Sequence, residues 1–148
     1  MNATLRKCSA VGALAFAGAL AVLAGCQSME PTMGGQQVSL AGSNEVPPVT
    51  TTATGTGTVT IGADRSVSAK ITVSGMTATA AHIHEGAAGV NGPVIVPFTK
   101  TGDNTFAAPD GAKLTDSQYA SYKAGKLYVN VHSARNPGGE VRAQLKGN

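Results

Sequence analysis

The sequence contains three histidines, and their spacing is typical of side chains that can share a metal ion. His82 and His84 are separated by Ile83 alone, so on an extended strand both rings project from the same face, about 7 Å apart at Cα. His132 ends the alternating segment 127–132, on the face opposite to the aliphatic residues of that segment. If these two strands are neighbours, three imidazoles meet on one polar surface.

Three imidazoles with one open position are a recurrent metal-binding geometry, and imidazole suits zinc, copper, nickel and iron. Because no thiolate or carboxylate pair lies nearby in the sequence, copper or zinc is the expected ion. We expect Glu85 to fix a ring tautomer as a hydrogen-bond acceptor. Asn130 and Tyr128 share the face of His132 and are expected to support the same site. Binding should fade below about pH 6.5, because a protonated imidazole has no lone pair to give.

Other interpretations of these residues remain open. A His-x-His pair is a weak motif, and a histidine at a strand end often bonds only backbone or water. The main alternative is a structural or adhesive surface domain that binds protein or glycan, with architectural histidines. An enzyme that uses the ion as a Lewis acid is a third hypothesis. Nothing indicates a hydrolase, since Glu140 is expected on a solvated strand and Asp116 in the first turn of a helix.

The elements that must position these residues are mostly short strands. An apolar period of two, interrupted by Gly, Pro, Asn and Asp, predicts strands at 38–40, 57–61, 67–73, 80–84, 94–98, 126–132 and 141–145. Residues 44–48 are excluded from a central strand by two prolines. Thr115 and Gln118 have capping-box spacing and Gly125 can end a helix, which predicts one short helix near 115–124. The pattern predicts an all-β fold: a single antiparallel sandwich or barrel with Greek-key connections and this helix.

The N-terminal segment 1–25 has the features of an export signal. Arg6 and Lys7 precede the uncharged apolar run 11–23, which is too short for an ordinary membrane-spanning helix. The four residues 23–26 (LAGC) resemble the bacterial lipobox, which implies cleavage before Cys26 and attachment of lipid to its thiol. The alternatives are an ordinary signal peptide with a chance cysteine, or an uncleaved anchor.

The expected exported chain is a lipid-anchored protein of the cell envelope. Residues 26–37 are polar and contain Pro31 and a Gly-Gly pair, which predicts a flexible tether before a domain at 38–148. Gln27 replaces the aspartate that would resemble an inner-membrane retention signal, and this favours the outer membrane, on its periplasmic or surface face. The membrane is the expected partner through the lipid, with any protein partner left open.

Charge and cysteine content restrict the function further. Loss of Arg6 and Lys7 with the leader, which holds no acidic residue, lowers the net charge from +3 to +1. No nucleic-acid partner is therefore expected. Cys8 leaves with the leader and Cys26 is consumed by lipid, so the domain has no disulfide, no cysteine nucleophile and no thiolate ligand.

Five short motifs, in this order, resemble the CHRD domain, which is named after chordin. They are LAGSNEVPP (40–48), HIHEG (82–86), NGPV (91–94), LYVNVH (127–132) and NPGGEVR (136–142). The likeness extends over about residues 38–145. It implies a compact all-β domain of secreted and surface proteins; in chordin such repeats belong to an extracellular antagonist of a growth factor. It implies no known enzyme, and it places all three histidines in shared motifs without naming a ligand.

Overall fold

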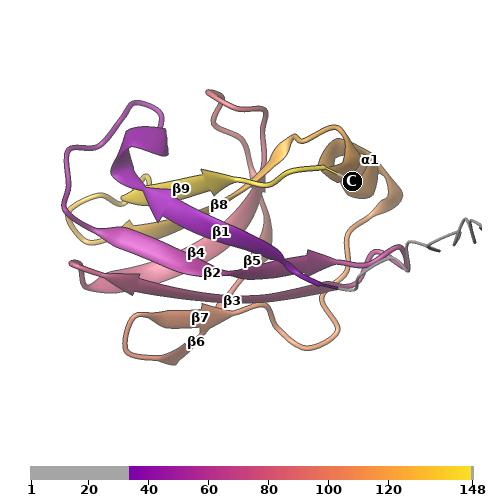
Figure 1. The fold of residues 1–148 in the computed structure, drawn as a ribbon, viewed down its shortest axis with the longest axis horizontal. Coiled ribbons are helices and arrows are strands. Elements are labelled where there is room, and N and C mark those ends of the chain that lie inside the picture. Colours follow the sequence, from indigo (N-terminus) through magenta and orange to yellow (C-terminus); the bar gives the residue numbers. More distant parts are fainter. Residues whose placement is uncertain (1–33, 148) are drawn as a thin grey trace, which may run out of the picture. The chain divides into compact units, whose positions relative to one another are not determined.

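The computed structural model describes residues 34–147, which form one antiparallel sheet with a short helix (Figure 1). The lipobox, Cys26 and most of the expected tether lie outside the described residues. The nine strands follow the order β5-β4-β8-β9-β1-β2-β3-β7-β6. Their bounds are β1 Gln36–Ala41, β2 Thr54–Ile61, β3 Val67–Ser74, β4 Ala78–Glu85, β5 Val94–Pro97, β6 Thr99–Gly102, β7 Thr105–Ala107, β8 Leu127–Ser133 and β9 Val141–Gln144. The prediction of an all-β fold with one helix is confirmed for this part of the chain.

The sheet curls until its two edges nearly meet, which makes it barrel-like. Edge strands β5 and β6 are consecutive in the chain and are separated only by Phe98. The amide of Phe98 donates to the carbonyl of Ala81 on β4, 3.0 Å away. The Lys100 side chain on β6 donates to the carbonyl of Ala78, which also lies on β4, at 3.3 Å. These contacts place β6, one edge strand of the sheet, beside β4, which is next to the other edge strand.

The hairpin of β2 and β3 shows why the alternating pattern produces strands here. All eight residue pairs of the two strands are in register, from Thr54 opposite Ser74 to Ile61 opposite Val67. Along β3 buried and exposed residues alternate without exception. Ile71 is fully buried, and its side chain is worth roughly 1.5 to 3 kcal/mol when removed from water. The apolar residues of the alternating segment 67–73 are therefore the buried ones.

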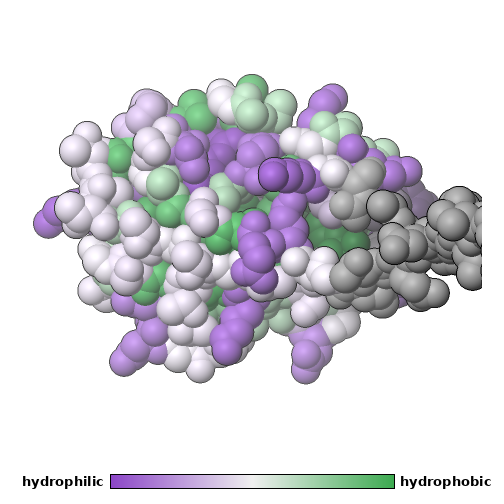
Figure 2. Space-filling model, viewed as in Figure 1, coloured by the Kyte–Doolittle hydropathy of each residue, from purple (hydrophilic) through white to green (hydrophobic). Residues whose placement is uncertain are grey.

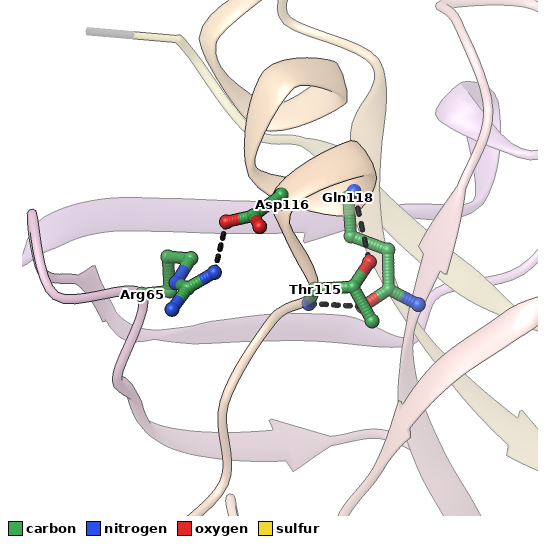
Figure 3. A network of polar contacts seen from close by, with 4 residues as sticks. All are labelled: Arg65, Thr115, Asp116 and Gln118. Atoms are coloured by element: carbon green, nitrogen blue, oxygen red, sulfur yellow. Dashed lines mark hydrogen bonds and ion pairs between the residues drawn. The ribbon is translucent and has the colours of Figure 1, made fainter.

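The helix α1 (Asp116–Lys123) begins and ends where the sequence predicts. Thr115 Oγ1 accepts from the amide of Gln118, and the Gln118 side chain accepts from the amide of Thr115, which closes the capping box (Figure 3). Asp116 pairs with Arg65 of the β2–β3 turn and so fixes the helix start to the sheet. Gly125, with a φ of 69°, follows the last turn.

The first strand begins earlier than the sequence suggests. Gln36 and Gln37 are polar and lie within the predicted tether, yet they pair with Val59 and Thr58 of β2. The Gln37 side chain donates to Thr58 Oγ1 at 2.7 Å, which compensates for the absence of apolar periodicity. The ordered domain therefore includes at least two residues of the segment 26–37.

The surface of residues 34–147 exposes few large hydrophobic side chains. Val90, within the Gly-rich segment 86–93, and Val94, directly after it, are 53% and 46% exposed. On the face seen in Figure 2, hydrophobic areas are small and are interrupted by hydrophilic ones. No helix within the described residues is long and apolar enough to span a membrane.

Candidate metal centre

The pairing of β4 with β8 brings the three histidines together. The strands are antiparallel, with His82 opposite Asn130, His84 opposite Tyr128, and Ala80 opposite His132. Because side chains alternate across a strand, all these polar residues emerge on the outer face of the sheet. The two strands that carry the histidines are therefore neighbours, as convergence of the three rings requires.

The opposite face of the same strands anchors the cluster. Ile83, Val129 and Val131 are fully buried in the core. Every residue of β8 is buried, which means that its polar side is covered as well. The cover comes from loops: Asn91 of the Gly-rich segment donates to the carbonyl of Val46, 2.6 Å away, and so joins two of them over the site. The cluster thus lies between a rigid sheet and a loop layer.

The imidazole nitrogens are close enough to converge on one ion. One nitrogen from each of His82, His84 and His132 lies within 4.8 Å of the other two. His82 Nδ1 lies 2.9 Å from His132 Nε2, and the centroids of these two rings are 4.7 Å apart. Zinc binds such nitrogens at about 2.0 to 2.1 Å, so side-chain adjustments of the rings would let all three reach one ion.

Backbone carbonyls determine which nitrogen of the His84 and His132 rings carries the proton and which holds the lone pair. His84 Nδ1 lies 2.9 Å from the carbonyl oxygen of Gly92, and His132 Nδ1 lies 2.9 Å from that of Pro137. A carbonyl only accepts, so both Nδ1 atoms carry the proton and donate. In the neutral rings Nε2 then holds the lone pair. Metal-binding histidines commonly have this arrangement, with the other ring nitrogen donating to a fixed acceptor.

Burial keeps the cluster uncharged. It lowers the pKa of all three histidines, and for His82 the value falls to about 4, with His132 and His84 adding repulsion between the rings. His82 therefore keeps its lone pair well below pH 6.5, the value that the sequence alone suggests, and burial shifts the pKa of His84 and His132 in the same direction.

A stack of three side chains leads away from the cluster. The Tyr128 ring lies parallel to the His84 ring, within 10° and with centroids 4.9 Å apart. On Tyr128 rests the guanidinium of Arg142, whose Cζ is 3.4 Å from the ring centroid. Arg142 is 1% exposed and donates to Val90 O at 3.0 Å and to Asn91 Oδ1 at 3.1 Å, which ties the loop layer to β9.

Two acidic residues differ from their sequence-based roles. Glu85 does not contact the rings: neighbours on a strand point to opposite faces, and Glu85 accepts a hydrogen bond from Ser121 of α1 at 2.6 Å. The acceptors that fix the tautomers are instead backbone carbonyls. Glu140 does not lie on a solvated strand, since it is 6% exposed and accepts from Thr51 and Ser133.

Glu45 and Arg142 belong to the surroundings of the site and are not evident from spacing. Glu45 is 5% exposed although it lies in the Pro-rich loop after the short 3₁₀ helix Gly42–Asn44. Arg142 alternates with aliphatic residues along β9, which is typical of an exposed arginine. The only available signal is that both occur in motifs of the CHRD resemblance. Their burial results from loops that the alternation does not describe.

A nearly closed antiparallel sheet with a buried three-histidine cluster on its outer face defines a small all-β domain with a candidate metal centre. The family model of the CHRD domain matches residues 36–145, and the chain belongs to the CHRD domain family. Neither a curated protein nor a solved structure matches the chain. Family membership confirms the resemblance seen in the motifs.

Proposed function

We propose that this protein is an exported, lipid-anchored CHRD protein of the cell envelope that binds copper or zinc through His82, His84 and His132. The observation that carries the proposal is the state of the ring nitrogens. His84 Nε2 is buried without a hydrogen-bond partner, while Nδ1 of the same ring is held by a carbonyl. An unpaired buried acceptor costs roughly 1 to 3 kcal/mol, and a metal ion would supply its missing partner.

The three imidazole ligands suit a metal ion that prefers nitrogen ligands. Three neutral imidazoles with no thiolate favour zinc or copper, whereas magnesium and calcium prefer oxygen ligands. His82 is less buried than His84 and His132, which leaves a side from which an ion can enter. His82 Nδ1 and His132 Nε2 share a hydrogen bond, and an ion bound to His132 Nε2 would replace this contact.

The envelope location is proposed from the N-terminal segment. The lipobox-like residues 23–26 and the polar segment after them support cleavage and lipid attachment at Cys26. A tether of about ten residues would let the domain sit on the order of 20 Å from the membrane surface.

The direct test is a metal titration of the full-length expressed protein in detergent, after removal of metal by a chelator. We expect one equivalent of Zn(II) or Cu(II) to bind in competition with a chromophoric chelator. Each of His82→Ala, His84→Ala and His132→Ala should weaken binding at least 10- to 100-fold. That range is typical for substitution of residues that only hold a metal ligand in place, so loss of a ligand should cost at least as much. The triple variant, which has no histidine left, provides the background.

Thermal unfolding separates metal binding from an architectural role. A ligand that binds only the folded state raises the melting temperature of the wild type, and the triple variant should not respond. If the histidines are architectural, the substitutions change stability without metal, and added ions leave wild type and variant equally unaffected. A triple variant that binds one equivalent with wild-type affinity would overturn the proposed site.

A further inference from the structure

Three buried acceptor atoms lack a hydrogen-bond partner within residues 34–147: Glu45 Oε1, His84 Nε2 and Asn130 Oδ1. Their residues are 5%, 8% and 2% exposed. Buried polar groups are nearly always hydrogen-bonded, so each exception requires a physical reason. With Glu45 ionised and the His84 ring neutral, all three atoms are acceptors, which makes the deficit one of donors.

These acceptors belong to one cluster around Asn130. The Asn130 amide lies near enough to Glu45 and to His84 to influence the pKa of both. A Cβ at Gly139 would lie 2.6 Å from Asn130 Nδ2 and 2.6 Å from Glu45 Oε1, so only glycine leaves room for both side chains at this position. The φ of 133° at Gly139 is a second reason for glycine there.

In the observed orientation Asn130 can donate only from Nδ2, and Glu45 Oε1, His84 Nε2 and Asn130 Oδ1 are left without a donor. His84 Nε2 holds a lone pair because Nδ1 donates to Gly92, and Asn130 directs its Nδ2 towards the carbonyl of Gly138, 3.5 Å away. Burial raises the pKa of Glu45 to about 7 even though Arg142 lies near, so its negative charge is poorly compensated. An electropositive group from outside the chain would satisfy all three atoms.

We propose that Glu45 and Asn130 extend the histidine cluster into an oxygen-lined subsite that holds a water molecule bound to the metal ion. The inference rests on the proposed function. The water oxygen would occupy the position that three histidines leave open, and its two O–H groups would donate to Glu45 Oε1 and Asn130 Oδ1.

The structure favours a water bridge over direct ligation by Glu45. The carboxylate is not among the side chains whose ligand atoms lie within 4.8 Å of one another. A hollow of about 280 Å³ lies against Glu45, and Asn91 and Gly139 help to line it. A carboxylate that stands back from the ion can bind a metal-bound water.

The test compares Zn(II) affinity and the Co(II) absorption spectrum of the full-length protein and four variants. Glu45→Gln and Asn130→Leu should weaken Zn(II) binding 10- to 100-fold and change the Co(II) spectrum, because the first removes the negative charge that attracts the bound water and the second removes its oxygen acceptor. Asn130→Asp keeps an oxygen acceptor and should retain the wild-type spectrum. Glu140→Gln is the matched control: this buried carboxylate bonds Thr51 and Ser133, and its change should leave metal affinity unaltered.

The outcomes distinguish this inference from the proposed function. If the wild type binds no ion, the metal site itself is wrong. If wild-type binding depends on the histidines but Glu45→Gln and Asn130→Leu keep its affinity and its Co(II) spectrum, the subsite alone is wrong. Melting temperatures without metal show which variants are folded, and Glu45→Gln, which preserves side-chain shape, supplies the comparison if Asn130→Leu does not fold.

Discussion

His82 Nδ1 lies 2.9 Å from His132 Nε2, although 50 positions separate the two residues in the chain. The contact depends on the register of β4 with β8, where His82 is opposite Asn130, two residues before His132. It holds two rings in contact without an ion. The cluster is therefore largely preformed by a sheet whose other face is core, which reduces the ordering that binding must achieve.

Acid should destabilise the metal-free protein. Because the folded-state pKa of each histidine is lowered, for His82 from 6.5 to about 4, the unfolded chain takes up protons first as the pH falls. The resulting loss of folding stability is absent above about pH 6.5 and grows as the pH falls to about 4. We expect a loss on the order of 1 to 2 kcal/mol from the cluster, after allowance for solvent screening.

Urea unfolding of metal-free protein between pH 4 and 7.5 measures this effect. A variant with all three histidines changed to glutamine should lose stability less steeply with acid. Glu45 acts in the opposite sense, since its raised pKa makes the folded state lose stability as pH rises from 4.5 to about 7. Both proteins retain Glu45, so only the difference between their curves reports the histidines. Parallel curves would contradict the prediction.

Replacement of Arg142 should loosen the loop layer over the site. Arg142→Leu leaves the carbonyl of Val90 without a donor, takes one of two donors from that of Ala87, and removes the cation from the Tyr128 ring. We expect a loss of about 3 kcal/mol in the free energy of unfolding. Arg142→Lys keeps the charge but lacks the planar guanidinium with its several N–H donors, so it should recover only part of the lost stability.

Amide hydrogen exchange gives the local readout for the same variant. The amides of the segment 86–92 should exchange faster in Arg142→Leu, whereas those of the β2–β3 hairpin should change only as global stability does. Uniform acceleration throughout the domain would show that Arg142 has no special role in the loop layer.

Removal of the lipidation cysteine should release the protein from membranes. Cys26→Ala takes away the thiol to which lipid would be attached, so labelling with a fatty-acid analogue should be lost. The variant should then accumulate as precursor or appear in the aqueous phase of a detergent partition. Cys8→Ala, a change inside the expected leader, is the control and should label normally. A Cys26→Ala protein that still partitions with detergent would refute lipid anchoring.

The capping interaction of α1 should be measurable by itself. Thr115→Ala removes the acceptor of the Gln118 amide and should cost about 1 kcal/mol. Thr115→Ser keeps the hydroxyl and should stay close to wild type in a urea titration. Equal losses in both variants would mean that the threonine methyl group, and not the cap, stabilises the helix start.

Local patterns in the sequence determine much of the fold. The alternation in 67–73 predicts the buried face of β3, and the spacing of Thr115 and Gln118 predicts the helix start. His82 and His84 must share a face wherever that strand lies. These features depend on residues a few positions apart, whose geometry is set by strand and helix periods. The short strands β6 and β7 lack such a period; β6 is exposed along its length, and the sequence gives no sign of either.

Only the tertiary structure decides which distant segments meet at the histidines. The β4–β8 pairing brings His132 to the pair on β4, and the loops bury Glu45 and Arg142, which carry charges that usually indicate exposure. The acceptors of the ring protons are the carbonyls of Gly92 and Pro137, not Glu85. Every residue has a carbonyl, so no residue type identifies one as an acceptor, and only the folded path of the backbone places it at a ring.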